Sequence, residues 1–600
     1  MGFTRRDLLT FTGGSAVGLA LTPVPWKLLR DTSLLSENWP GVPQPPQGEI
    51  RTRYTTCTLC PAGCGVRARC VGDQPVSLAG VPGHPNSRGV LCPIGLVGHH
   101  FAFCRDRVTG PLACNKPATI ERALADVSAA VAACGPRESV AILDPRPGRA
   151  ASLVYRRFLA GLPNGLHLTA PNSQPFGSFG IDLENTRAIL SFGAPVLDGW
   201  LCPGRVLAGR GHFQLIQVEA AYSRTASLAD LWVPLLPGTE EIFAAEVIRA
   251  LQGGSADTQA AAVARILLQN QPAIAVGEGP SVSRLNTVLA NAGKPGGYLP
   301  RRDFTPATAL AAVPDGSIRV LLVEEGAAAE PLPWDLIRRK LVPHNPVVVA
   351  LTPWLDASAR HADYVIPAPM YLESLDEAPT PAGSIVGGFS LSPALLAAPP
   401  GRTPPAEFVL RLAHDTSTYS DILKQRIAAI RKDGRGSLFT YADAKSKRVS
   451  DVVSSDDLWK AMLSGAMWLD DPLPPGKARG ADLQAGVPLR PGRVGPPPPS
   501  PEYPLILVAA ETPLPHASPL MSKLYRESGL RRPANAAAVH PDTGRGHGLA
   551  DGCRAIVKSP AAAVDLQVIF DAAVMPGVIE MTRVGHIVPP GGTTGSIRRA

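Results

Sequence analysis

The stretch CTLCPAGCG at residues 57–65, together with GVLCPIG at residues 89–95, decides how the amino-terminal part of this 600-residue chain folds. Three thiolates from one tight loop and a fourth from a later segment supply the converging geometry that a [4Fe-4S] cube requires. Gly and Pro in the loop let the backbone wrap closely round such a cube. The C-x2-C-x3-C-x27-C spacing therefore predicts an electron-carrying iron-sulfur domain with four ligands: Cys57, Cys60, Cys64 and Cys92.

Other metal chemistry fits this pattern less well. Zinc sites usually pair two C-x2-C knuckles or add histidines, so the three-residue gap and the single later cysteine are less usual for zinc. Attachment of haem c requires C-x-x-C-H, and Cys60 is followed by Pro61. A further interpretation keeps the cluster but gives it a purely structural role in the amino-terminal domain.

The remaining cysteines show no metal spacing among themselves, so they are predicted to be buried free thiols rather than disulfides. They are Cys70, Cys104, Cys114, Cys134, Cys202 and Cys553. Three histidines flank the fourth motif cysteine, and loop histidines without a partner are usually solvated. They are His84, His99 and His100.

The amino terminus carries a pattern typical of export. In TRRDLLTFTGGSAVGLALTP, Arg5 and Arg6 directly precede an apolar stretch that contains glycines, as in twin-arginine signals. That route transports folded proteins, which suits a chain whose cluster is inserted in the cytoplasm. We therefore expect residues 1–35 to be a signal, and the chain to lie on the periplasmic side of the cytoplasmic membrane. It would be peripheral there, or anchored by the signal if this is not cleaved.

Composition places the rest among globular proteins. Hydrophobic residues make up 45% and charged residues 18% of the chain, and the length predicts several domains. The net charge of +8 is modest for 600 residues, and no nucleic-acid-binding motif accompanies the basic stretch between Lys424 and Arg448. We therefore expect no nucleic-acid partner.

Short apolar runs that end in Gly or Pro and precede helical stretches recur through the middle of the chain. SVAILD, RAILSFGAP, HFQLIQVEA, PAIAVGEGP, RVLLVEEG and NPVVVALTP are such runs. They predict buried parallel strands in layered α/β domains, whose ligands lie beyond the carboxyl ends of the strands. After the Pro-rich segment that ends near Pro504, short strands separated by turns predict a β-rich barrel.

In this order the motifs resemble the molybdopterin oxidoreductases that carry a bis-pterin guanine dinucleotide cofactor. The cysteine pattern followed by DRVTGPL is similar to their small iron-sulfur domain. Four later segments resemble further parts of the family: IDLENTRAILSFGAP, QVEAAYSRTASLADLWVPLLPGTEE, ALTPWLDASARHADYVIPAPMYLES, and AAAVHPDTGRGHGLADGCRAIVKSP with VMPGVIE. The third leads to the family's glutamate position, here Glu373.

The resemblance implies an α/β fold with the following parts. Residues 1–35 form the signal or anchor and 48–112 the [4Fe-4S] domain; 113–415 form α/β domains with parallel sheets. A variable segment and Pro-rich linker follow at 416–500, and a dinucleotide-binding-like β-barrel of the double-psi type at 501–600. It also implies pterin-site equivalents at Ser173, Ser178, Gly193, Glu219, Arg224 and Gly238, with Ser173 or Ser178 in the place of the metal ligand.

Several departures from the family bear on the metal chemistry. The Lys or Arg two residues after the fourth cysteine is replaced by Ile94. The segment TAPNSQPFGSFG offers serines but no cysteine for the metal, and Glu219 is followed by two alanines where a nucleotide-gripping aspartate is expected. These changes predict a chain that keeps the fold and one [4Fe-4S] cluster without a working molybdenum site.

LSFGAPVLDGW and the signal make the chain look most like the molybdopterin-like iron-sulfur subunit of alternative complex III and related quinone reductase complexes. The resemblance then implies a membrane-associated quinol/quinone oxidoreductase. Its partners would be a ferredoxin-like iron-sulfur subunit, a multihaem cytochrome c and an integral membrane quinone-binding subunit. The alternative is a genuine molybdenum or tungsten enzyme that binds molybdopterin guanine dinucleotide and acts on a small periplasmic substrate.

Overall fold

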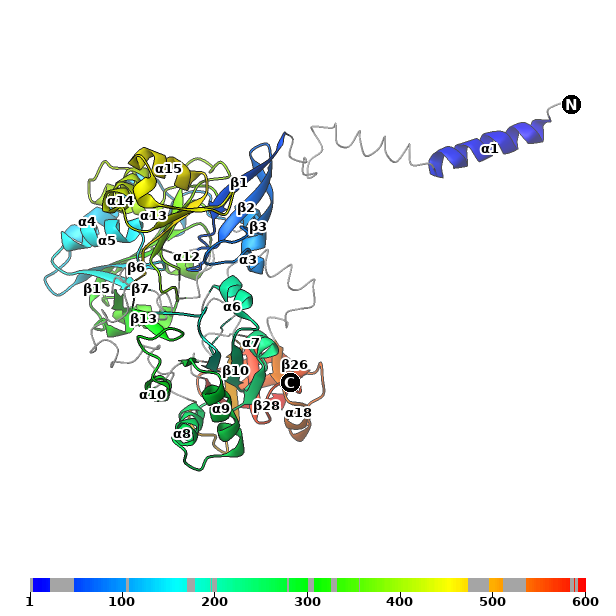
Figure 1. Ribbon diagram of the computed structural model, residues 1–600. Helices are drawn as coiled ribbons and strands as arrows, with labels where there is room; N and C mark the ends of the chain where they lie inside the picture. Colours follow the sequence, from blue (N-terminus) through cyan, green and yellow to red (C-terminus); the bar gives the residue numbers. More distant parts are fainter. Residues whose placement is uncertain are drawn as a thin grey trace. The chain divides into compact units, whose positions relative to one another are not determined.

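Strands from distant parts of the chain assemble into separate sheets and one barrel, as the computed structural model shows (Figure 1). The structure describes residues 4–21, 48–103, 107–169, 179–194, 196, 202–277, 280–300, 307–324, 332–355, 357–381, 383–472, 496–510, 536–582, 588 and 592–600. These belong to two units, one of Met1–Arg51 with Cys70–Gln74 and one of Thr52–Arg69 with Pro75–Ala600.

In the first unit, α1 (Arg5–Leu21) contains the two arginines and the glycines of the apolar stretch. The Asp7 amide donates to the Thr4 hydroxyl at its amino-terminal end. Among the described residues, no helix is both long and apolar enough to cross a membrane.

The cysteine motif is built on a small sheet of order β1-β2-β3. The strands are β1 (Ile50–Thr56), β2 (Gly65–Val71) and β3 (Gln74–Gly80). The alternate burial of β2 is that of a strand with one face covered. The short helices α3 (Pro93–Val97) and η1 (Gly98–Phe103) follow the returning segment.

An eight-stranded sheet of order β14-β7-β6-β15-β16-β17-β4-β5 forms the largest layer. Its central strands run parallel, and their apolar residues are covered on both faces. They are β6 (Ser139–Asp144), β7 (Gly165–Thr169), β15 (Ile318–Glu324), β16 (Val347–Thr352) and β17 (Tyr364–Pro367). The edges are β14 (Thr308–Ala309), β4 (Leu112–Ala113) and β5 (Lys116–Pro117).

Alternate residues of these strands enter two different cores. Val140 and Ile142 pack with helices drawn cyan to yellow in Figure 1: α4 (Ile120–Ala132), α5 (Ala150–Ala160), α13 (Pro405–Leu412), α14 (Tyr419–Asp433) and α15 (Ser455–Leu463). Ala141 and Leu143 pack on the other face with α11 (Trp334–Lys340) and α12 (Ala357–His361).

A second parallel sheet has the order β11-β10-β9-β12. In the sequence, its strands lie between β7 and β15 of the first sheet. Its strands are β9 (Ala188–Phe192), β10 (Gln214–Glu219), β11 (Leu231–Pro234) and β12 (Ala273–Gly277). One face packs with α8 (Glu240–Leu251), α9 (Thr258–Gln269) and α10 (Pro280–Leu289). The other packs with α6 (Pro203–Gly209) and the pair β8 (Phe179–Ile181) and β13 (Tyr298–Pro300), while α7 (Arg224–Leu228) follows β10.

The chain ends in an antiparallel sheet and a barrel. The sheet has the order β18-β19-β22-β20-β21. Its strands are β18 (Asp376–Ala378), β19 (Gly388–Ser392), β20 (Ser437–Thr440), β21 (Ser446–Arg448) and β22 (Ala466–Leu469). The closed barrel has the order β23-β27-β24-β26-β25-β28, with α18 (Pro541–Gly546) after β24. Its strands are β23 (Leu505–Ala510), β24 (Ala536–Val539), β25 (Arg554–Lys558), β26 (Ala563–Phe570), β27 (Val578–Thr582) and β28 (Thr593–Arg599). The parallel α/β sheets and the carboxy-terminal barrel that the sequence predicts are thus confirmed.

Candidate iron-sulfur site

A tight loop between β1 and β2 presents three of the predicted cluster ligands. The Cys57 amide donates to the Cys64 carbonyl over 2.8 Å and closes the loop. Gly63 has a φ of +56°, a conformation that an L side chain would strain. Cys57 and Cys64 are buried and Cys60 is half-buried, so the loop turns its thiols away from solvent.

The fourth predicted ligand returns from a different segment. Cys92 is the N-cap of α3, and its Sγ accepts a hydrogen bond from the Gly95 amide at 3.4 Å. Cys92 lies close enough to Cys57 and Cys60 for its charge to raise the pKa of both. The fold therefore brings the four cysteines together, although the assignment of ligands remains a prediction.

A fifth cysteine, which the sequence pattern did not single out, joins this group. Cys202 is the N-cap of α6, and its Sγ lies 3.7 Å from that of Cys64. No spacing rule could have found it, because it lies 138 residues beyond Cys64 in a different domain segment. Of the other cysteines predicted to be buried free thiols, Cys202 is both. Cys114, Cys134 and Cys553 are free, but Cys114 is exposed and the other two are half-buried. Cys70 is buried, and Cys104 lies outside the described ranges.

The thiols are held in an environment that disfavours bare thiolates. Burial raises the pKa of Cys57 to about 12 and also raises the pKa values of Cys60 and Cys92. The hydrogen bond between Cys64 and Cys202 raises the pKa of Cys64 and lowers that of Cys202. Iron offsets such a cost because each thiolate then bonds to a cation.

The described residues contain no group of three or more His, Cys, Asp or Glu side chains arranged to hold a single metal ion. A cube places each of its four thiolates on a different iron, so its ligands stand farther apart than those of a single zinc ion.

The nearby histidines have different environments. His84 is buried, and its Nδ1 accepts hydrogen bonds from the amides of Asn86 and Ser87. Burial lowers its pKa to about 3, and burial lowers that of His99 to about 4. The prediction that these residues are solvated is wrong for His84 and His99, since packing rather than solvent surrounds them; His100 is exposed.

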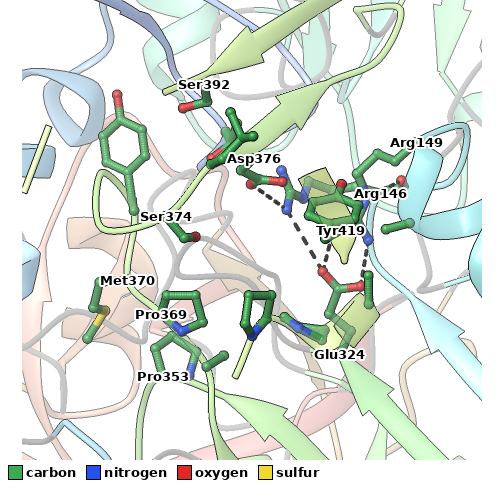
Figure 2. Close-up of a pocket in the computed structure, with 18 of the residues that line it drawn as sticks. Arg146, Arg149, Glu324, Pro353, Pro369, Met370, Ser374, Asp376, Ser392 and Tyr419 are labelled. Carbon is green, nitrogen blue, oxygen red and sulfur yellow. Dashed lines mark hydrogen bonds and ion pairs between the residues drawn. The ribbon is translucent and has the colours of Figure 1, made fainter. Parts of the chain in front are cut away.

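Beside the cysteine loop lies a cavity of about 80 Å³ at the carboxyl ends of β6, β15, β16 and β17. Thr58 and Leu59 of the loop line it, as do Arg146, Arg149 and Glu324. Figure 2 shows that both guanidinium groups point toward the Glu324 carboxylate. This edge is where ligands bind in open α/β sheets.

Most of this edge is occupied by a buried ionic network. Arg149 donates to Glu324 at 2.5 and 2.8 Å and to Asp144 at 2.8 Å. Arg146 pairs with Asp376 at 2.9 Å, as the dashed lines in Figure 2 show. Burial alone would raise the pKa of Asp144, but Arg149, His167 and Ser152 outweigh it and hold that pKa below its ordinary value.

The position two residues after Cys92 carries no cation, since Ile94 is a buried apolar side chain. A different cation acts on the cysteines: the Arg146 guanidinium opposes the rise in the pKa of Cys57. Glu373, at the family's glutamate position, is buried and pairs with Arg107 through two hydrogen bonds.

The predicted pterin-site equivalents divide into two groups. Ser173 and Ser178 lie outside the described residues. Gly193 and Glu219 meet at the carboxyl edge of the four-stranded sheet, where the Gly193 amide donates to the Val218 carbonyl and Glu219 accepts from Gln217 and Ser223. Arg224 begins α7, and the Gly238 amide donates to Glu240 ahead of α8.

The segment after β10 is also covered by the barrel. The Tyr222 amide donates to the Ala573 carbonyl at 2.9 Å, and the Met575 amide donates to the Ala220 carbonyl at 3.0 Å. Ala220 and Val574 share a small core with Val578. The backbone segment that would bind a nucleotide is therefore hydrogen-bonded to the chain's own barrel.

Comparison with known proteins agrees with the resemblance drawn from the motifs. Residues 50–102 match the molybdopterin oxidoreductase Fe4S4 domain family. The chain is 26% identical to the menaquinone reductase molybdopterin-binding-like subunit of Nitratidesulfovibrio vulgaris, over 73% of this chain and 77% of the relative. It is 25% identical to the major subunit of the nitrate-inducible formate dehydrogenase of Escherichia coli, over 34% of this chain and 24% of that protein.

A solved structure extends the likeness of fold. Acetylene hydratase from Pelobacter acetylenicus aligns with a TM-score of 0.67 at 13% identity, over 91% of this chain and 100% of the other. The chain is thus similar to molybdopterin oxidoreductases, and residues 50–102 match their Fe4S4 domain.

Proposed function

We propose that this chain is the iron-sulfur electron-transfer subunit of a membrane-associated quinol/quinone oxidoreductase complex, without a working molybdenum site. One [4Fe-4S] cluster would be held by Cys57, Cys60, Cys64 and Cys92. The observation that carries the proposal is the convergence of these thiols within a segment that matches an Fe4S4 domain.

The residues present fit a cluster. The cysteine thiols are shielded from water, and the Gly95 amide already donates to the Cys92 sulfur. Burial and amide hydrogen bonds to sulfur are the protein's means of setting a cluster potential. When bound, the cluster supplies one-electron transfer, and the chain's residues exclude water from the sulfurs and fix the loop.

The described residues at the edge of the eight-stranded sheet leave little room for a pterin dinucleotide. The cavity there is about 80 Å³, whereas sites for drug-sized ligands span about 300–1,000 Å³. Opening it would separate Arg149 from Glu324 and Asp144, which are all nearly inaccessible to solvent. Breaking a buried pair in this way costs several kcal/mol. This supports the proposed absence of molybdenum chemistry.

The menaquinone reductase relative is itself named as a subunit, which supports membership of a multi-subunit assembly. The proposed partners are a ferredoxin-like iron-sulfur subunit, a multihaem cytochrome c and an integral membrane quinone-binding subunit. The paired arginines at the start of α1 support twin-arginine export to the periplasmic side of the membrane.

The pair Cys64 and Cys202 offers a matched test of the cluster ligands, because both are buried and their sulfurs lie 3.7 Å apart. Iron, acid-labile sulfide and the electron paramagnetic resonance signal would be measured in Cys64→Ala and Cys202→Ala. We expect Cys64→Ala to lose the intact cube and Cys202→Ala to retain about four irons per chain. Retention of a full cube in Cys64→Ala, or its loss only in Cys202→Ala, would refute the ligand assignment.

The same preparations allow a test for molybdenum, tungsten and pterin. We expect none of the three in stoichiometric amount. One molybdenum or tungsten atom per chain with pterin would instead establish the alternative enzyme, and attention would pass to Ser173 and Ser178.

A further inference from the structure

Tyr371 is a buried phenol that packs against the cysteine loop. It follows β17 in a turn that is held by the Leu395 and Leu396 amides, both of which donate to the Leu372 carbonyl at 2.8 Å. Tyr371 is 8% exposed. Its ring lies against Gly98, where an added Cβ would come within 2.7 Å of the ring, and Leu59 of the loop contacts the same point. The ring is therefore fixed between the cysteine loop and the segment that follows Cys92.

The hydroxyl of Tyr371 has no hydrogen-bond partner of acceptable geometry among the described residues. A buried hydroxyl left in this way is costly, so it is expected to have a function or a partner not yet in place. After burial itself, the groups that raise its pKa are the thiols of Cys57, Cys64 and Cys92. The phenol therefore lies beside the cluster cysteines.

We propose that the Tyr371 hydroxyl donates a hydrogen bond to the Cys57 sulfur when the cluster is bound, and so raises the cluster's reduction potential. The inference rests on the proposed cluster ligands and deepens that function. Reduction adds negative charge to the cluster, and a donor aimed at a ligand sulfur stabilises the reduced state more than the oxidised one. Tyr371 acts through Cys57 and is therefore a positioning residue rather than a catalytic one.

Tyr371→Phe tests this because it removes the hydroxyl and keeps the ring that packs on Gly98. The full-length chain, loaded with its cluster, would be titrated with redox mediators while the cluster signal is recorded. We expect unchanged iron content and a lower midpoint potential. The ratio of oxidised to reduced cluster at fixed potential should rise by roughly tenfold, which is about 59 mV for a one-electron couple.

Tyr298→Phe is the matched control. Tyr298 is also a buried phenol, but its hydroxyl donates to the Ala275 carbonyl in the core of the four-stranded sheet. Its removal should leave the midpoint potential unchanged, since no cysteine is among the groups that act on it.

The outcomes separate this inference from the function on which it rests. An intact cluster with the same potential in Tyr371→Phe and the unaltered protein would overturn the role of Tyr371 alone. Iron loss confined to Tyr371→Phe would also overturn it, because the hydroxyl would then be needed to retain the cluster rather than to tune it. Absence of iron from the unaltered protein would refute the proposed function itself.

Discussion

The carboxyl edges of the two parallel sheets are closed by different means. In the eight-stranded sheet, Asp144 and Glu324 end adjacent strands and are paired with arginine side chains from the loop after β6. In the four-stranded sheet, the residues after Glu219 instead form backbone hydrogen bonds with the barrel. Buried ion pairs thus close the edge of the eight-stranded sheet, and main-chain hydrogen bonds to the barrel close the edge of the four-stranded sheet. The comparison teaches that a ligand-binding edge can be filled without altering the strands beneath it.

The largest effect is expected from removing the central cation of the ionic edge. Arg149→Met removes the cation that Asp144 and Glu324 share in the buried network, and we expect the free energy of unfolding to fall by about 3–5 kcal/mol. Chemical denaturation monitored by circular dichroism would measure it.

The matched variant lies beside the four-stranded sheet. Arg210 pairs with Asp230 at 2.9 Å, but both side chains are partly exposed, so Arg210→Met should cost no more than about 1 kcal/mol. Equal losses in the two variants would show that burial of the ionic edge contributes nothing of its own.

A smaller effect is expected at the carboxyl edge of the four-stranded sheet, from Gly277→Ala at the end of β12. Gly277 has a φ of +136°, and a Cβ there would lie 2.7 Å from the Cβ of Phe192. We expect a loss of about 1–3 kcal/mol from backbone strain and crowding. Thermal unfolding of Gly316→Ala is the comparison, because Gly316 also has a positive φ but open space around it. A smaller loss in Gly277→Ala than in Gly316→Ala would contradict the crowding.

The last comparison concerns the loss of stability in acid. This loss is absent at neutral pH, but it should distinguish the two edges most sharply. The pKa of Asp144 is lower in the folded chain than its ordinary value of 3.8. The contribution of Asp144 to stability is therefore present above about pH 3.8 and is lost as the pH falls below 3.8. Denaturation at pH 7, 4 and 3 should show this loss in the unaltered protein and a weaker loss in Arg149→Met. Parallel pH profiles would exclude Asp144 as the source.

The sequence predicted much of the fold because its signals are local. Runs such as SVAILD and NPVVVALTP are apolar throughout, so their burial in parallel strands follows from the residues themselves. The cysteine loop was predictable because Cys57, Cys60 and Cys64 lie within one turn of chain.

The rest depends on contacts between distant segments. Cys202 and Tyr371 reach the cysteine loop only through the tertiary fold, and neither belongs to a spaced motif. The replacement of the family's lysine or arginine by Ile94 could be read from the sequence. The approach of Arg146 to Cys57 could not, because it requires the loop after β6 to lie beside the cysteine loop.

The order of strands has a consequence for biosynthesis. The four-stranded sheet is complete once residues 188–277 have left the ribosome. In the eight-stranded sheet, β6 can pair early with β7, but its other neighbour, β15, begins only at Ile318. The barrel waits longest, because its first strand pairs with its last, Leu505 with Gly595. We expect the four-stranded sheet to fold first on the nascent chain. Its edge after Glu219 then stays uncovered until β28, the last strand of the barrel, has been synthesised.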